Sequence, residues 1–132
     1  MNRPAVLCCS FLLLLLAGCG SESDPRAQVR GTVRYRNQLL TSGTVVFVPD
    51  VDRGTPNVLA IGTIKPDGTY QLQTDQNPSL APGWYRVTIV AGFGPDSAMR
   101  LALPDKYRDP KRSGLEREVK AGRDNVCDFK LE

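Results

Sequence analysis

Apolar and polar residues alternate along most of the chain from residue 28 onward, and turn residues separate the alternating stretches. In the first stretch, 28–36, Val29, Gly31, Val33 and Tyr35 fall on one face, and mostly arginines fall on the other. A period of two residues is typical of a β-strand with one buried face. No segment keeps a helical period over ten or more residues. The pattern therefore predicts an all-β domain.

The alternating region contains about seven strands, a number typical of a two-sheet sandwich. Pro66, Asp67 and Gly68 supply a fixed φ and then a residue that tolerates positive φ, which predicts a hairpin. The stretch 43–49 is apolar on both faces and predicts a central strand covered on two sides. The expected strands are 28–36, 43–49, 58–65, 69–74, 84–91, 115–121 and 125–131.

Residues 92–114 interrupt this alternation. Pro95, Pro104 and Pro110 would each remove a backbone donor from a central strand. We expect a long loop here, with at most one short edge strand near 101–103.

The first eighteen residues have the arrangement of a signal peptide. The positive charge of Arg3 precedes a nearly unbroken apolar run over 5–16. A run of about a dozen residues is too short for a membrane-spanning helix, which needs roughly 20. We therefore expect residues 1–18 to be removed from the mature protein.

The run ends in Leu16-Ala17-Gly18-Cys19, which resembles the lipobox of bacterial lipoproteins. The resemblance implies cleavage before Cys19, transfer of a diacylglyceryl group to its thiol, and acylation of the new amino group. Gly20 follows the cysteine where inner-membrane lipoproteins of enterobacteria carry aspartate, which implies the outer membrane in a cell that has two. The alternative is an ordinary secretory site that leaves Cys19 as a free thiol.

Residues 19–27 would then be the lipidated cysteine and a flexible polar tether, followed by one domain over 28–132. The tether spans at most ~26–29 Å, so the domain would stay close to the lipid surface. Cys8 and Cys9 leave with the signal peptide, and Cys127 has no partner for a disulfide. Cys127 falls on the apolar face of its strand, where a thiol acts as a small hydrophobe.

The composition argues against an enzyme. Histidine is absent, which excludes the usual histidine-dependent nucleophiles, histidine-ligated zinc and any imidazole base. The formal net charge of +3 is too small to indicate nucleic-acid binding. Asp50 and Asp52 lack the further acidic ligands that a calcium loop uses. We therefore expect no catalytic residue, cofactor or metal.

Several stretches in order resemble the carboxypeptidase regulatory-like, or transthyretin-like (prealbumin-like), domain found in some small bacterial lipoproteins. The resemblance implies an Ig-like or transthyretin-like Greek-key sandwich and a non-catalytic accessory role. A branch of this fold that hydrolyses 5-hydroxyisourate uses histidines and a C-terminal Tyr-Arg-Gly-Ser signature, and this chain has neither. The stretches are Val-Arg-Gly-Thr-Val at 29–33, Gly-Thr-Val-Val-Phe-Val-Pro at 43–49, Asp-Gly-Thr-Tyr-Gln-Leu at 67–72, Pro-Gly-Trp-Tyr-Arg-Val at 82–87 and Lys-Tyr-Arg-Asp-Pro at 106–110.

Two aromatic residues are candidates for ligand binding. The alternation places Trp84 on the outer face or at a sheet edge, where an indole can stack on a sugar ring. Tyr107 could supply a second ring. The alternative, which we favour, is that Trp84 packs over the Pro82-Gly83 turn, because a single aromatic is a poor sugar platform.

Basic residues occur in two groups that could hold anionic surface groups. The alternative is a solvated surface whose charges are shared with nearby carboxylates, and the near-balanced charge favours it. The groups are Arg30, Arg34 and Arg36 in the first strand, and Lys106, Arg108, Lys111 and Arg112 in the long loop.

The sequence thus favours a lipid-anchored, non-enzymatic sandwich with a structural or protein-interaction role in the cell envelope. Its expected partners are membrane lipid through Cys19 and an unidentified envelope protein or polysaccharide, with no nucleic acid. A carbohydrate-binding lipoprotein is the second hypothesis. A hydrolase that works without histidine is the third.

Overall fold

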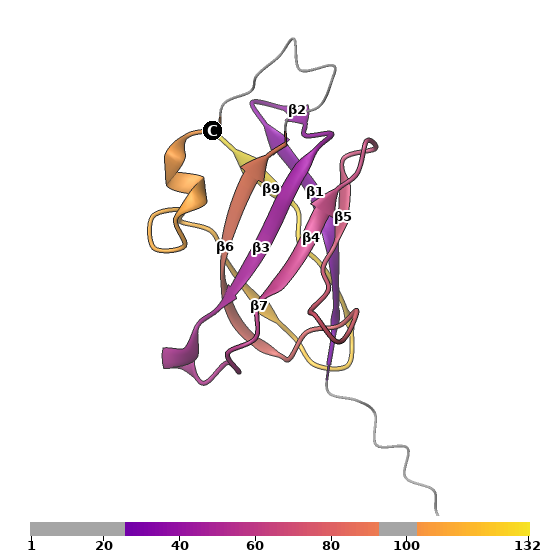
Figure 1. Cartoon of the computed structure of the whole chain (residues 1–132), viewed down its shortest axis with the longest axis vertical. Coiled ribbons are helices and arrows are strands. Elements are labelled where there is room, and N and C mark those ends of the chain that lie inside the picture. The colour runs from indigo at the N-terminus through magenta and orange to yellow at the C-terminus, as the bar shows by residue number, and fades with distance from the viewer. Residues whose placement is uncertain (1–25, 93–102) are drawn as a thin grey trace, which may run out of the picture.

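Strands account for nearly all of the regular structure in the computed structural model, which describes residues 26–92 and 103–132 (Figure 1). The expected signal peptide and Cys19 lie outside these residues. Two short 3-10 helices, η1 (Val51–Arg53) and η2 (Asp105–Arg108), join the strands. Within the described ranges, no helix is long and apolar enough to cross a membrane. The strands are β1 (Gln28–Tyr35), β2 (Gln38–Leu39), β3 (Gly43–Pro49), β4 (Ala60–Ile64), β5 (Thr69–Gln71), β6 (Gly83–Ala91), β7 (Glu116–Val119), β8 (Asp124–Val126) and β9 (Phe129–Leu131).

Two sheets form a sandwich, as the alternation predicts. One sheet is antiparallel throughout, in the order β4-β3-β6-β7. The other is built around β1, which pairs antiparallel with β2 and β5 and parallel with β8 and β9. The all-β prediction is therefore confirmed. Most of the expected strands are present, although several are shorter than the sequence pattern indicates.

The last expected strand, 125–131, is divided into β8 and β9 by an interruption at Cys127 and Asp128. The Cys127 amide donates to the carbonyl oxygen of Arg30 at 2.7 Å. The Thr32 amide then donates to a side-chain oxygen of Asp128 at 2.8 Å, where a regular ladder would use a backbone carbonyl. Gly31 lies opposite, and a Cβ on it would come within 1.9 Å of the Cys127 carbonyl oxygen. This close approach explains why glycine stands in the middle of β1.

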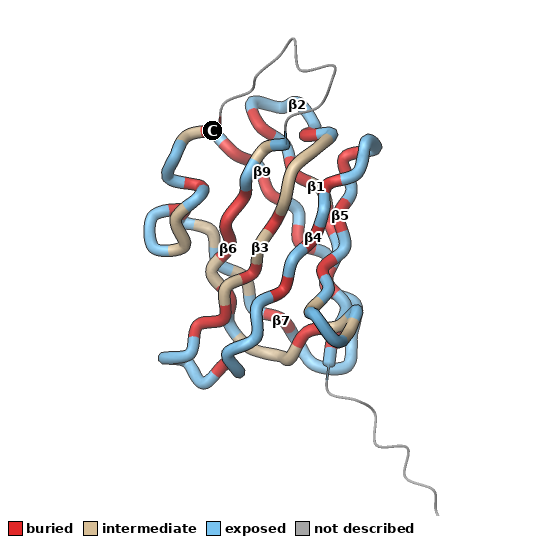
Figure 2. The backbone as a smooth tube through the Cα atoms, viewed as in Figure 1, coloured by how far each residue is buried: buried red, intermediate tan, exposed pale blue. Residues whose placement is uncertain are grey.

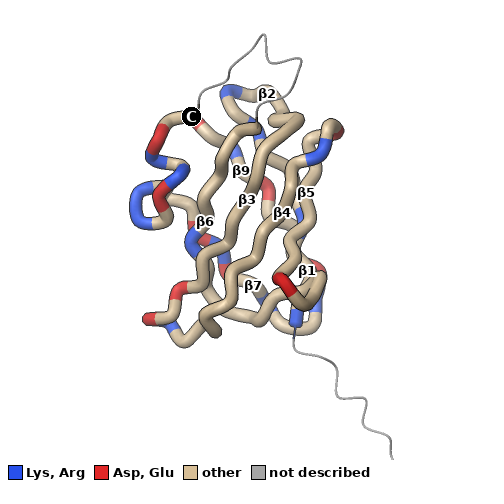
Figure 3. Tube along the Cα trace, viewed as in Figure 1, with Lys and Arg blue, Asp and Glu red and all other residues tan. Residues whose placement is uncertain are grey.

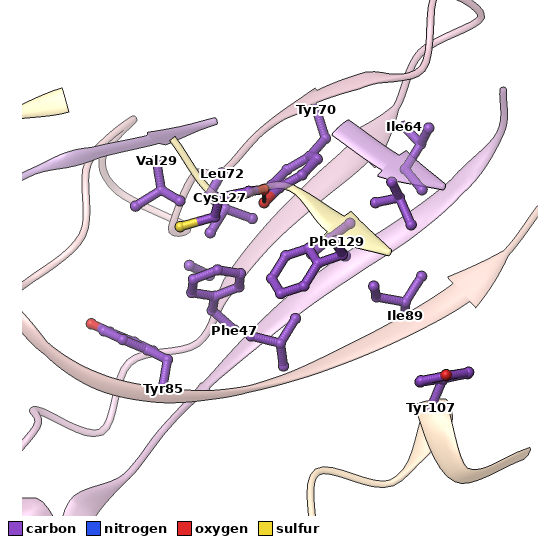
Figure 4. Close-up of a cluster of buried hydrophobic side chains, with 14 of the residues drawn as sticks. Val29, Phe47, Ile64, Tyr70, Leu72, Tyr85, Ile89, Tyr107, Cys127 and Phe129 are labelled. Carbon is purple, nitrogen blue, oxygen red and sulfur yellow. Dashed lines mark hydrogen bonds between the residues drawn. The ribbon is translucent and has the colours of Figure 1, made fainter. Parts of the chain in front are cut away.

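The core lies between the sheets and is rich in aromatic rings (Figures 2 and 4). The ring centroid of Phe47 is 5.8 Å from that of Tyr85 and 6.2 Å from that of Phe129. The Tyr70 hydroxyl is buried and donates to the carbonyl oxygen of Cys127 at 2.6 Å. The Cys127 side chain is itself buried, as predicted, and burial raises the pKa of its thiol. Cys127 thus packs as part of the core.

The expectation that β3 is covered on both faces is wrong for the described residues. Val45 and Phe47 are fully buried between the sheets, whereas Val46 and Val48, on the other face, are only half-buried. β3 is central only in its sheet, between β4 and β6. The apolar run therefore reflects one buried face and one outer face lined by valines.

The expected long loop, 92–114, contains η2 and no strand in its described part. Of the possible edge strand near 101–103, residues 101 and 102 lie outside the described residues. Leu103 and Tyr107 are buried in the core, so this segment packs against the sandwich.

Candidate functional site at the N-terminal end of the sandwich

The chain enters the sandwich at the end opposite the C-terminus (Figure 1). Ala27 forms a β-bridge with Leu80, in which each amide donates to the other's carbonyl oxygen at 2.8 Å. Ala27 is only 2% exposed. The expected tether includes Ala27, but in the structure this residue is part of the domain. The chain between Cys19 and the domain is therefore one residue shorter than expected.

The loop that carries η1 lies at this same end and is fastened to the start of β6. The Trp84 amide donates to the Thr55 hydroxyl oxygen at 2.9 Å, and that hydroxyl donates to the Trp84 carbonyl oxygen at 3.0 Å. The same carbonyl accepts the Asp50 amide at 2.9 Å. Gly83 has φ +148, and a Cβ there would lie 2.5 Å from the Thr55 hydroxyl oxygen. Glycine at this position allows the loop to approach the strand closely.

A buried carboxylate joins the loop to the sheet through ion pairs. The Asp50 side chain is 6% exposed, and one of its oxygens lies 3.4 Å from Arg53 and 3.5 Å from Arg86. Arg53 also lies 3.5 Å from the Glu116 carboxylate of β7. These ion pairs link η1, β6 and β7. They also occupy Asp50, and no three acidic or cysteine side chains in the described ranges are grouped closely enough to hold a metal ion.

Trp84 points to the outer face of its sheet, as the alternation predicts, and is 36% exposed. The Arg53 guanidinium lies over the indole, 4.7 Å from the ring centroid. This contact is a cation–π interaction, and it covers one part of the ring. Trp84 thus contacts the loop that carries η1, rather than the Pro82-Gly83 turn considered from the sequence, and part of its ring stays exposed.

Apolar side chains gather around this end. Among the described residues, eight large apolar side chains are exposed, and five of them belong to the segment 51–61 or to Trp84. Val51, Val58 and Leu59 are the most exposed of the five, at 54%, 51% and 51%. The expected strand 58–65 includes Val58 and Leu59, but β4 begins only at Ala60. Both residues therefore lie in the loop ahead of the strand.

An open groove of about 1160 Å³ adjoins these residues. Its walls come from the segments 56–61 and 73–81, and Arg26 lines it as well. The groove is rich in amide and hydroxyl side chains, but its one aromatic lining residue, Tyr85, is almost fully buried. Trp84 is not among its lining residues. The groove and the indole thus do not combine into a single aromatic platform.

Tyr107, the second aromatic candidate, offers no exposed ring. Its side chain is 4% exposed, and its hydroxyl is hydrogen bonded to the backbone of Glu132. The Lys106 ammonium lies 4.9 Å from the centre of its ring. The proline-rich segment folds back onto the sandwich and buries the tyrosine, so Trp84 and Tyr107 cannot form a shared surface for a sugar.

The basic residues of β1 and of the turn that follows it have partners of several kinds. Arg30 pairs with Asp124 at 2.8 Å, Arg34 donates to the carbonyl oxygen of Asn37 at 3.3 Å, and the Arg36 guanidinium lies over the Tyr35 ring. Figure 3 shows charges of both signs along the segment that carries η2. These contacts favour the solvated, shared-charge interpretation over a dedicated anion site.

The role of the loop residues at this end was not predicted from the sequence pattern. The contact of Arg53 with Trp84 could not be predicted, because it depends on how the chain turns after β3. A signal was present, however, because Val51, Val58 and Leu59 are interrupted by Gly54 and Pro56 and fit no regular alternation. Apolar residues in an irregular loop are candidates for a contact surface.

No family model matches the chain, and a search of curated proteins finds no significant relative.

Proposed function

We propose that this chain is a bacterial lipoprotein, anchored through Cys19, whose sandwich serves as a non-enzymatic structural or protein-interaction module of the cell envelope. The observation that carries the proposal is the apolar run ending in Leu16-Ala17-Gly18-Cys19. Two or three acyl chains are needed for firm anchoring, because a single chain binds membranes only marginally. The proposal includes the resemblance to carboxypeptidase regulatory-like domains, and the two-sheet architecture is consistent with it.

The non-enzymatic part of the proposal is supported by the chemistry of the side chains. The chain has no histidine, and the Cys127 thiol is buried with a raised pKa, which opposes the thiolate form a nucleophile needs. The Asp50 carboxylate is engaged by two arginines. These residues are therefore poor candidates for an acid, a base or a nucleophile.

Metabolic labelling with a fatty-acid analogue tests the anchor. We expect the wild-type chain to carry the label and to fractionate with membranes, and Cys19→Ala to be unlabelled and released. Cys127→Ala is the matched control, because it also removes a thiol but should leave labelling unchanged. An unlabelled wild-type chain in the soluble fraction would contradict the proposal.

Glycan binding through Trp84 is the second candidate, favoured by the exposed part of the indole. It is weakened by the burial of Tyr107, which leaves a single aromatic. A glycan screen of the mature chain against its Trp84→Ala form separates the two candidates. Binding that is lost in Trp84→Ala would support the second candidate, and equal signals from both forms would remove it.

A further inference from the structure

The exposed apolar side chains at the N-terminal end raise the question of what covers them. Val51 lies in η1, and Val58 and Leu59 lie just ahead of β4. Each side chain is about half exposed, at 54%, 51% and 51%. Isolated exposed apolar residues are ordinary, but a group of them marks a contact surface. We define Val51, Val58, Leu59 and Trp84 as the apolar end patch.

The patch lies at the end where the chain enters the sandwich, and this position indicates what covers it. Ala27 enters the domain at the same end, and Arg26 lines the groove that Val58 and Leu59 also line (Figure 1). From Cys19 to Arg26 there are seven residue steps, which extend to at most ~25 Å. An acylated Cys19 would therefore keep this end, rather than the opposite one, close to the bilayer.

We propose that the apolar end patch inserts into the surface of the membrane to which Cys19 is anchored, so that the sandwich docks on the bilayer with its N-terminal end down. This inference rests on the proposed lipid anchor and goes beyond it, because an anchor alone leaves the domain free to rotate on its tether. Tryptophan suits such a position, since its amphipathic ring favours the membrane interface. Arg53, stacked on the indole, would meet the headgroups.

The charges around this end are of both signs. Figure 3 shows both basic and acidic positions on the loops of this end, and the ion pairs there include Arg53 with Glu116 and Arg30 with Asp124. Such a surface has little net attraction for anionic lipid. The docking we propose is therefore driven by apolar contact, and it should occur on zwitterionic vesicles and change little with salt.

Trp84 is the only tryptophan of the chain, so its fluorescence reports directly on this end. The test places the chain from Gly20 onward, with an N-terminal hexahistidine tag, on phosphatidylcholine vesicles that contain nickel-chelating lipid. Half of the preparations carry bromine on the acyl chains, which quenches tryptophan only in close contact. We expect the brominated lipid to quench Trp84 and the emission to shift to shorter wavelength.

Two controls isolate the patch. The same chain tagged at the C-terminus is held by its opposite end and should show no quenching by brominated lipid. The double variant Val58→Asp/Leu59→Asp should lose the quenching while it stays bound through the tag, whereas Leu39→Asp, in β2 at the far end, should keep it (Figure 1). Circular dichroism checks that each variant is folded, and half-exposed loop residues tolerate the change.

The tag replaces the acyl chains, so this result does not depend on whether Cys19 is acylated. Absence of quenching in the N-terminally tethered wild type would overturn the docking and would assign the patch to a protein partner instead. Quenching that survives Val58→Asp/Leu59→Asp would also overturn it. If the wild-type chain is not labelled at Cys19 but Trp84 is quenched by brominated lipid, the lipid anchor is contradicted. The proposal that the apolar end patch binds membranes would then still stand.

Discussion

The hydroxyl of Tyr107 donates to the main-chain oxygen of Glu132 and accepts the amide of the same residue, each at 3.1 Å. This pair of hydrogen bonds ties the segment that carries η2 to the chain just after β9. Tyr107 is buried in the core, so its ring and its hydroxyl act together. The segment that carries η2 also contacts β6, so the two bonds fasten it between β6 and the end of β9.

Tyr107→Phe keeps the ring and removes both bonds. We expect it to lower the free energy of unfolding by about 1–2 kcal/mol, since a net hydrogen bond contributes about 1 kcal/mol and the Glu132 amide loses its partner. Urea denaturation at neutral pH measures the loss. Tyr107→Leu should cost more, because it also leaves a cavity. A Phe variant as stable as the wild type would show that the bonds contribute nothing net.

Gly31→Ala tests the close approach of β1 to the interruption between β8 and β9. The added Cβ would lie 1.9 Å from the Cys127 carbonyl oxygen, and backbone cannot move aside as a side chain would. We expect a loss of about 3 kcal/mol in the free energy of unfolding. Gly122→Ala is the control, because φ there is +64 but nothing lies within 4 Å of the new Cβ. It should cost only about 1 kcal/mol, and equal losses would refute the clash.

The strands could be predicted from local alternation, since each carries its own buried face. The range 43–49 matches β3 at both ends, and the outward position of Trp84 followed from the same period. The pairing could not be predicted in this way. The parallel partners of β1 come from the other end of the chain, and the bond from Thr32 to Asp128 joins residues 96 positions apart.

The candidate site was only partly visible in the sequence. Tyr107 was a candidate second ring for a ligand in the expected long loop, but its burial results from how the whole segment packs against the sheets. The stacking of Arg53 on Trp84 needs the turn after β3 and the glycine at position 83, which bring the loop onto the strand. Tertiary contacts of this kind produce little pattern in the local sequence, so they could not be predicted from it.

Asp50→Asn removes the charge that joins Arg53 and Arg86 while keeping the shape of the side chain. We expect a loss of about 1 kcal/mol, discounted because both arginines are partly exposed and can be solvated. The loss should shrink in high salt, where ion pairs are screened. Thermal unfolding at low and high salt measures both effects. Asp52→Asn, in the same loop but exposed, should change stability by less than about 0.5 kcal/mol.

Stability should fall at alkaline pH because of two buried groups in contact. Burial raises the pKa of Tyr70 far above its usual 10.0 and the pKa of Cys127 above its usual 9.0. Above pH 9 these groups begin to lose their protons in the unfolded chain but keep them in the folded chain. Because the unfolded state binds fewer protons, a rise in pH stabilises it relative to the folded state. The free energy of unfolding should decline by up to about 1.4 kcal/mol per pH unit for each group.

Cys127→Ala separates the two contributions. It removes the group whose usual pKa is 9.0, so the decline between pH 9 and 10 should flatten. The decline above pH 10.0 should persist, because burial raises the pKa of Tyr70 and also that of Tyr85. Urea denaturation in steps from pH 7 upward gives the slopes, and slopes are compared because the lost sulfur also changes packing at every pH. If the variant's curve runs parallel to the wild type from pH 7 through 10, the Cys127 thiol does not contribute to the alkaline loss.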